Sequence, residues 1–123
     1  MTTNAISWFE IPAADFRRAT QFYETIFQIT TILEDVDPPR IKSIFPVDSG
    51  VTGAIAYGPD WTPSAHGVVI YLNAGDDLGL VLDRVEGAGG TVVEPKQLIG
   101  INEVYWGRFS DTEGNLIGLL SPH

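Results

Sequence analysis

Two stretches of this sequence, about sixty residues apart, have the same spacing of apolar side chains. Residues 14–27 (ADFRRATQFYETIF) and 76–90 (DDLGLVLDRVEGAGG) each place these side chains on one face of an α-helix. Asp15 and Asp77 are the predicted N-caps, and the pair Gly89–Gly90 is expected to end the second helix. The equivalent positions differ by 62: Phe16, Ala19, Thr20, Tyr23 and Ile26 correspond to Leu78, Val81, Leu82, Val85 and Ala88.

Both predicted helices lie in the same order of predicted strands, which makes the repeat a β-α-β-β-β module. Segments rich in β-branched and aromatic residues predict strands at 6–12, 29–35, 41–48 and 51–58, and again at 68–74, 91–96, 103–111 and 115–122. We therefore expect one domain over residues 1–123, with module one at about 5–58, a linker at about 59–66 and module two at about 67–122. The predicted class is α+β, with the two modules forming a curved mixed sheet around a cleft and the helices on the outer face.

The charge balance restricts the classes of partner. The 123 residues include 16 acidic and 7 basic side chains, which give a formal charge of −9. So few cations cannot build a phosphate-binding patch, so we expect neither nucleic acid nor a membrane as partner. The chain has no cysteine, no stretch typical of a signal peptide and no apolar run of membrane-spanning length. A cytoplasmic protein is the expectation.

Three segments carry a resemblance to a known family: residues 8–27, residues 71–96, and residues 105–122 with their Asp-x-x-Gly-Asn turn. Together they resemble the vicinal oxygen chelate superfamily, which includes glyoxalase I, extradiol dioxygenases and bleomycin-resistance proteins, and they are most similar to a bacterial glyoxalase-like subgroup. The resemblance implies a homodimer that binds a small molecule. Gln28 stands where the family commonly has a glycine, which predicts an unusual backbone conformation or a different helix end there.

The family's enzymes bind a divalent metal through His, Glu or Gln on four strands. Carried over by the resemblance, these positions fall on Trp8, on Val69 or Ile70, on Ala54 and on Gly118. None of these side chains can coordinate a metal, so we expect no metal cofactor. A metal elsewhere is the alternative, but His66 lies too far from the site, and the remaining candidates are carboxylates on different strands, Glu10, Glu94 and Glu103.

Glu10 lies inside an apolar strand and shares a face with Trp8, because side chains alternate along a strand. In one interpretation a neighbouring cation or backbone group satisfies Glu10, and Trp8 is a core residue. In the other, Glu10 faces the cleft as a general base with a raised pKa or as a ligand anchor, and Trp8 offers a flat surface to the ligand.

Further candidate site residues come from the second module. Adjacent residues point to opposite faces, so either Tyr105 or Trp106 lines the cleft, and the resemblance favours Tyr105. Arg108 shares the face of Trp106 and is either a salt-bridge partner or an anchor for an anionic ligand or for Glu10, and Lys42 is a similar candidate. The register leaves open whether Tyr71 or Leu72 enters the cleft. The predicted ligand-binding residues are Trp8, Glu10, Ala54, Tyr71, Tyr105, Trp106, Arg108 and Gly118, with Glu10 and Tyr105 catalytic if the chain is an enzyme.

Three functions compete. The first is a protein that binds a small organic ligand in an aromatic-lined cleft, and the acidic balance favours a cationic one. The second is a metal-independent lyase or isomerase acting on a small carbonyl compound, with Glu10 as base and Tyr105 as donor to the oxyanion. The third is a relative that acts only through its dimer surface.

Overall fold

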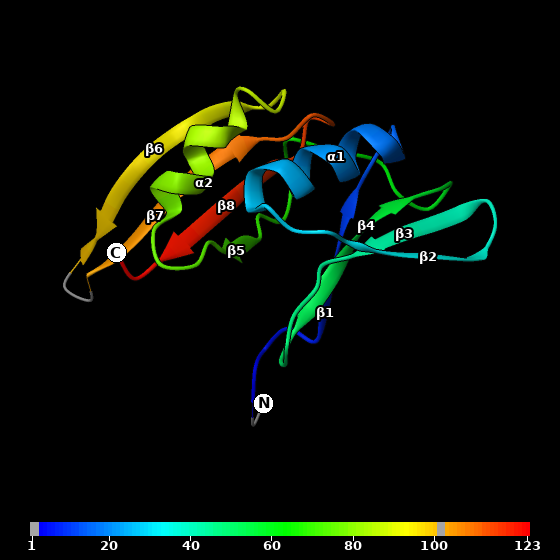
Figure 1. Cartoon of the computed structure of the whole chain (residues 1–123), viewed down its shortest axis with the longest axis horizontal. Helices are drawn as coiled ribbons and strands as arrows, with labels where there is room; N and C mark the ends of the chain where they lie inside the picture. The colour runs from blue at the N-terminus through cyan, green and yellow to red at the C-terminus, as the bar shows by residue number, and fades with distance from the viewer. Residues whose placement is uncertain (1–2, 101–102) are drawn as a thin grey trace.

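The computed structural model describes residues 3–100 and 103–123 and shows the β-α-β-β-β order twice (Figure 1). No helix in these two ranges is long and apolar enough to cross a membrane. The first module consists of β1 (Trp8–Pro12), α1 (Phe16–Phe27), β2 (Ile32–Asp37), β3 (Arg40–Ile44) and β4 (Thr52–Tyr57). The second consists of β5 (Tyr71–Asn73), α2 (Leu78–Val85), β6 (Thr91–Ile99), β7 (Val104–Ser110) and β8 (Leu116–Ser121).

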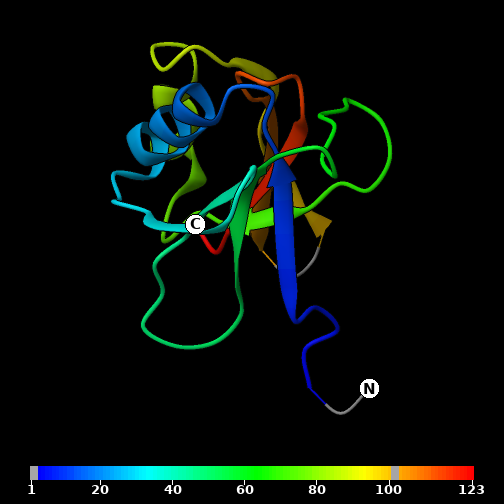
Figure 2. The same ribbon diagram turned by 90° about the vertical axis from the view of Figure 1, so that its right-hand side faces the viewer.

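The strands pair into two mixed sheets of four, in the orders β1-β4-β3-β2 and β5-β8-β7-β6. In each sheet the first and last strands of the module run parallel, and the other pairs are antiparallel. Both helices lie on the same side of the sheets (Figure 2). The predicted α+β class with tandem modules is confirmed, with the strands in two four-stranded sheets where one curved sheet was expected.

Local sequence accounts for the limits of α1. The Asp15 side chain accepts a hydrogen bond from the backbone N–H of Arg18 at 3.0 Å, which is the predicted N-cap. At the other end Gln28 adopts the left-handed conformation, with φ 54° and ψ 51°, and its N–H donates to the carbonyl of Glu24. The unusual backbone predicted at Gln28 is therefore present, and a side chain bears the cost that a glycine would avoid.

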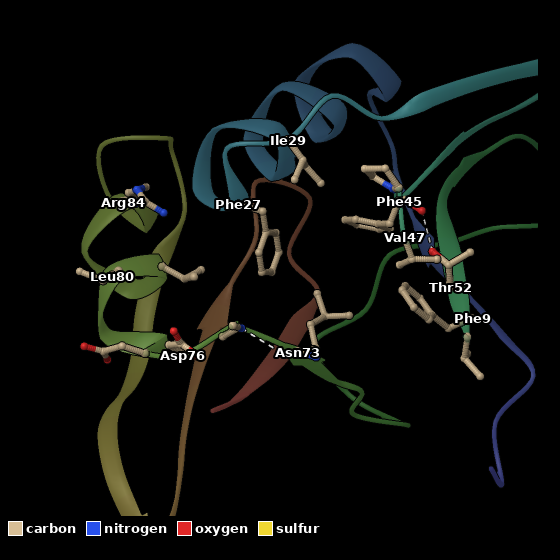
Figure 3. A pocket seen from close by; sticks show the side chains of 17 residues that line it. Phe9, Phe27, Ile29, Phe45, Val47, Thr52, Asn73, Asp76, Leu80 and Arg84 are labelled. Carbon is tan, nitrogen blue, oxygen red and sulfur yellow. Dashed lines mark hydrogen bonds between the residues drawn. The ribbon is translucent and has the colours of Figure 1, made fainter. Parts of the chain in front are cut away.

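One hydrophobic core serves both modules, because α1 contacts the second sheet as well as its own. The ring of Phe22 lies 5.7 Å from that of Phe109 on β7, and Tyr23 lies against Phe109 and Phe45. A cavity of about 560 Å³ remains on the same side of the sheets, between α2 and the first module (Figure 3).

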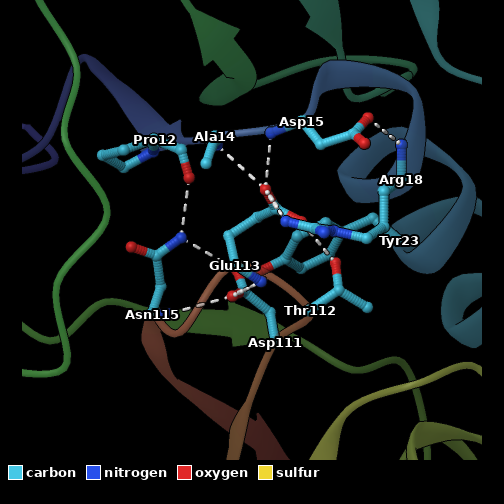
Figure 4. A network of polar contacts seen from close by, with 9 residues as sticks. All are labelled: Pro12, Ala14, Asp15, Arg18, Tyr23, Asp111, Thr112, Glu113 and Asn115. Carbon is cyan, nitrogen blue, oxygen red and sulfur yellow. Dashed lines mark hydrogen bonds and ion pairs between the residues drawn. The ribbon is translucent and has the colours of Figure 1, made fainter.

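A partly buried polar network joins the turn between β7 and β8 to the start of α1 (Figure 4). The Glu113 carboxylate accepts hydrogen bonds from the N–H groups of Ala14 and Asp15 and from the Arg18 side chain, at 2.8–3.1 Å. Asp111 accepts a 2.6 Å hydrogen bond from the hydroxyl of Tyr23. The Asp-x-x-Gly-Asn turn singled out in the sequence therefore holds the two modules together.

Candidate functional site

The face of the sheets opposite the helices carries most of the predicted site residues. In the first sheet Glu10 pairs with Ala54 on β4, and Lys42 pairs with Ala56 on the same strand. Ala54 and Ala56 are two residues apart, so all four side chains point to the same face of the sheet. In the second sheet Tyr71 pairs with Gly118, which pairs with Arg108. We call this side of the sheets the helix-free face: Trp8, Glu10, Lys42 and Ala54 in the first sheet, and Tyr71, Trp106, Arg108 and Gly118 in the second. Ala54 and Gly118 are buried there, so neither is accessible to a ligand in this structure.

Glu10 is the centre of a cluster in the first sheet. Its carboxylate accepts hydrogen bonds from the indole N–H groups of Trp8 at 3.2 Å and Trp61 at 3.0 Å, and it lies 2.8 Å from the ammonium of Lys42. The Lys42 ammonium also lies 5.4 Å from the centre of the Trp61 ring. A neighbouring cation thus satisfies Glu10, as the first interpretation predicted, while Trp8 is 43% exposed and is no core residue.

The electrostatics of the cluster keep Glu10 ionised. Partial burial by itself would raise the pKa of the Glu10 carboxyl, but hydrogen bonds from Lys42, Trp8 and Trp61 and the charge of Lys42 outweigh it and lower this pKa. The raised pKa that a general base at this position would need is therefore not present. Lys42 in turn has a raised pKa because it donates to Glu10.

A second cluster lies on the helix-free face of the second sheet. The Nε group of Arg108 donates to the hydroxyl of Tyr71 at 2.8 Å, and the guanidinium lies 4.9 Å from the centre of the Trp106 ring. Among the ion pairs found in residues 3–100 and 103–123, none includes Arg108. The register also places Tyr71 on this face and buries Leu72 in the core, which resolves the alternative that the sequence left open.

The preference for Tyr105 as the cleft-lining residue of β7 is wrong. Tyr105 pairs with Ser121, whose hydroxyl accepts a hydrogen bond from the first residue of α2. Its ring packs against the core beneath Lys96, whose ammonium lies 4.7 Å from the ring centre. Trp106 takes the position on the helix-free face instead.

Trp61 belongs to the site but was not predicted for it. It lies in the segment between β4 and β5, where no strand or helix period fixes a direction for the side chain. The only sequence feature that favoured a site role for Trp61 was its side chain, which combines a polar N–H with a large apolar ring. That feature does not predict a hydrogen bond to Glu10, which lies 51 residues earlier in the sequence. All three tryptophans of the chain, Trp8, Trp61 and Trp106, therefore lie on the helix-free face or contact its residues.

The residues at the family's metal positions do not fit a metal ion. Trp8 contributes an N–H that donates to Glu10, Ala54 a methyl group, and Gly118 no side chain, its place being covered by the Tyr71 ring. His66 lies in the segment between the modules, with its backbone bonded to Ser64. Within the described ranges, no three His, Cys, Asp or Glu side chains gather in a way that would hold a metal ion.

Comparison with solved structures agrees with this architecture. A glyoxylase/bleomycin resistance protein/dioxygenase domain from Frankia sp. EAN1pec has a TM-score of 0.75 at 12% identity, over 99% of this chain and all of that one (100%). A glyoxalase/bleomycin resistance protein from Albidiferax ferrireducens T118 has a TM-score of 0.69 at 17% identity, covering 96% and 99% of the two chains. Glyoxalase I from Zea mays has a TM-score of 0.69 at 16% identity, over 94% of this chain but 45% of that one.

Such low identities establish the fold alone, and no curated protein sequence matches the chain. The family itself is shown by sequence, since the model of the Glyoxalase/Bleomycin resistance protein/Dioxygenase superfamily matches residues 5–119. That range includes the first module, all of the second except the end of β8, and both clusters of the helix-free face. The chain therefore belongs to the Glyoxalase/Bleomycin resistance protein/Dioxygenase superfamily.

Proposed function

We propose that this protein binds a small planar organic ligand on its helix-free face, without the divalent metal of the family's enzymes. The observation that carries the proposal is the pair of indoles held by Glu10 in the first sheet, Trp8 and Trp61, with Trp8 exposed and its N–H fixed by the carboxylate. An indole that is held in place and still exposed offers a flat apolar surface at little cost in side-chain entropy.

Glu10 and Arg108 contribute to ligand binding in different ways. Glu10 is already paired with Lys42, so we assign it the role of orienting the two indoles. A carboxylate that already has a cationic partner is a poor anchor for a cationic ligand, which weakens the expectation based on the acidic composition. Arg108 lies on Trp106 with no carboxylate paired to it in the described ranges, so it is the group available for an acidic or carbonyl oxygen of the ligand.

The metal-independent lyase or isomerase has less support. A base that abstracts a proton near neutral pH works best with a pKa near that pH, whereas the pKa of Glu10 is lowered. Tyr105, the proposed oxyanion donor, lies on the other face of the sheet. If the wild type turned over a methylglyoxal–glutathione hemithioacetal and Glu10→Gln abolished this turnover, the enzymatic alternative would replace the binding function.

The expected homodimer is part of the proposal. The first sheet ends at β2, whose Ile32 and Leu33 are 56% and 61% exposed, and β6 ends the second sheet with Leu98 exposed. Apolar side chains on both faces of an edge strand favour cover by another chain. Light scattering after size exclusion gives the mass in solution, and a monomer at all concentrations would contradict the dimer.

Tryptophan fluorescence tests the binding function directly, because the three indoles report on this face. The probes are benzoate, benzyl alcohol and benzyltrimethylammonium, which share a ring and differ in charge. We expect saturable quenching with benzoate binding tightest, and Trp8→Leu to weaken binding about tenfold. Tyr57→Leu, which removes a 39% exposed ring at the end of β4, should leave the affinity unchanged. Absence of saturable quenching by all three probes would contradict the proposal.

A further inference from the structure

A cavity lies on the side of the sheets that carries the helices. The cavity of about 560 Å³ is bounded by α2 and β5 on one side and by the end of α1, β1 and the segment between β3 and β4 on the other (Figure 3). Its volume lies within the range of small-molecule sites. The cavity contains none of the eight residues named for the helix-free face, although Thr52, the partner of Trp8, and Asn73, two residues from Tyr71, also line it. Its apolar wall includes Phe9, Phe27, Phe45, Val47, Val51 and Leu80.

The internal repeat explains why this space is open. The residue of α1 equivalent to Arg84 is Phe22, and Phe22 is buried with its ring against Phe109. Gly90 lies so close to that ring that an added Cβ would be 2.7 Å from it, so the space beside α1 is filled. On the α2 side Arg84 replaces the aromatic ring, and α2 has 8 residues where α1 has 12.

The apolar side chains that line this cavity are in contact with water. Burial of their surface by an apolar ligand would be favourable. Three of them are also partly open to solvent: Leu80 is 57% exposed, Val47 50% and Val51 37%. Such a cluster of exposed apolar side chains around a concave surface is typical of a binding site.

The charged groups at the cavity indicate what the occupant carries. The Nη1 group of Arg84 donates to the carbonyl of Ile26 at 3.0 Å, which fixes the guanidinium and leaves its other donors available. Arg84 takes part in none of the ion pairs of the described residues. Asp77 is already bonded to Lys96 at 2.8 Å and to the N–H of Gly79. Asp76 is exposed, so solvent satisfies it, whereas the partly buried Arg84 gains most from an opposite charge.

We propose that this cavity is a second binding site, which takes an aromatic carboxylate with its ring among Phe9, Phe27 and Phe45 and its carboxylate on Arg84. Edge-to-face contacts with the phenylalanine rings hold the aromatic part. The planar guanidinium binds the carboxylate through charge-assisted hydrogen bonds. This site is independent of the function proposed for the helix-free face.

The test is a titration of the isotope-labelled protein with 2-naphthoate, followed by amide resonances in NMR spectra. We expect saturable shifts at Val47, Val51 and Leu72–Asp77, with small changes at Trp8, Glu10 and Arg108. The neutral analogue 2-naphthamide should bind at least about tenfold more weakly, because it lacks the charge that Arg84 recognises. Tighter binding of 2-naphthylmethylammonium, or shifts confined to the helix-free face, would overturn the proposal.

Three variants separate the contributions. Arg84→Gln should weaken 2-naphthoate binding about tenfold or more, whereas Arg17→Gln, the loss of an exposed arginine on α1, should change it less than about twofold. Leu80→Glu places a negative charge on the exposed wall without disturbing the core and should abolish binding. Trp8→Leu should leave it unchanged, which distinguishes this site from the helix-free face.

Two results would count against the proposal. The first is wild-type affinity in both Arg84→Gln and Leu80→Glu. The second is movement of the same amides when the protein alone is concentrated, which would make the cavity an interface between two copies.

Discussion

Replacement of Glu113 by glutamine tests the junction between the two modules. The Glu113 side chain has no exposed surface and accepts hydrogen bonds from Arg18, from Thr112 and from the N–H groups at the start of α1. Burial alone would raise the pKa of this carboxyl, but these hydrogen bonds outweigh burial and lower the pKa from 4.5 to about 2.

The size of the effect follows from that pKa. One pKa unit corresponds to about 1.36 kcal/mol, so the ionised form contributes about 3 kcal/mol to the free energy of unfolding. Arg18 is 51% exposed, and solvent screens its share, so we expect Glu113→Gln to lose about 2–3 kcal/mol at pH 7. A folded-state pKa below the unfolded one stabilises above about pH 4.5, and this stabilisation is lost as the pH falls towards 2.

Urea unfolding of both proteins at pH 7, 5, 4 and 3 measures this dependence. The difference between wild type and Glu113→Gln should be largest at pH 7 and pH 5 and should shrink at pH 4 and pH 3. Glu86→Gln is the matched control, because it removes the same charge from an exposed position at the end of α2. A difference below about 1 kcal/mol at pH 7, or one that does not change with pH, would refute the reasoning.

Two further predictions concern the end of α1 and the Glu10 cluster. Gln28→Gly should raise the free energy of unfolding by about 0.5–1 kcal/mol, because it removes a side chain from a left-handed position; Gln21→Gly, inside the same helix, should lower it by about 1 kcal/mol. Equal signs in the two urea series would contradict this. Lys42→Met should raise the pKa of Glu10 by removing its cationic partner, and NMR titration of the carboxyl carbon measures it. An unchanged Glu10 pKa would mean that the two indoles, not Lys42, control it.

The parts of the fold that were predicted correctly depend on periodicity within one element. The helical spacing and the two capping aspartates each need only a few neighbouring residues, and both N-caps are present. The shared face of Trp8 and Glu10 is another relation of this kind, since residues two apart in a strand always point the same way. The second helix ends at Val85, before the predicted glycines, because the turn that follows it extends to Gly89.

The residues that were assigned wrongly or missed depend on relations between elements. The choice between Tyr105 and Trp106 required the absolute orientation of β7, which similarity to a subgroup cannot supply. The sequence of β7 does indicate its orientation. Gly107 and Phe109 share the face of Tyr105 and pack on the core. Arg108 shares the face of Trp106 and needs access to solvent. A charged residue within a half-buried strand is therefore a better guide to orientation than an aromatic residue.

The two modules have diverged in different ways on the two sides of their sheets. On the helix-free face the family's metal positions hold Trp8, Ala54 and Gly118, and Glu10 now fixes indoles where imidazoles or carboxylates would hold an ion. On the helix side an aromatic ring fills the space beside α1, and its equivalent beside α2 is Arg84 at an open cavity. The side chains at the family's metal positions do not suit a metal ion, and this concerns the helix-free face only. In a fold built from two copies of one module, one copy can keep a packed core position while the equivalent position in the other copy changes. Phe22 and Arg84 are such a pair, and we therefore propose a ligand on each side of the sheets.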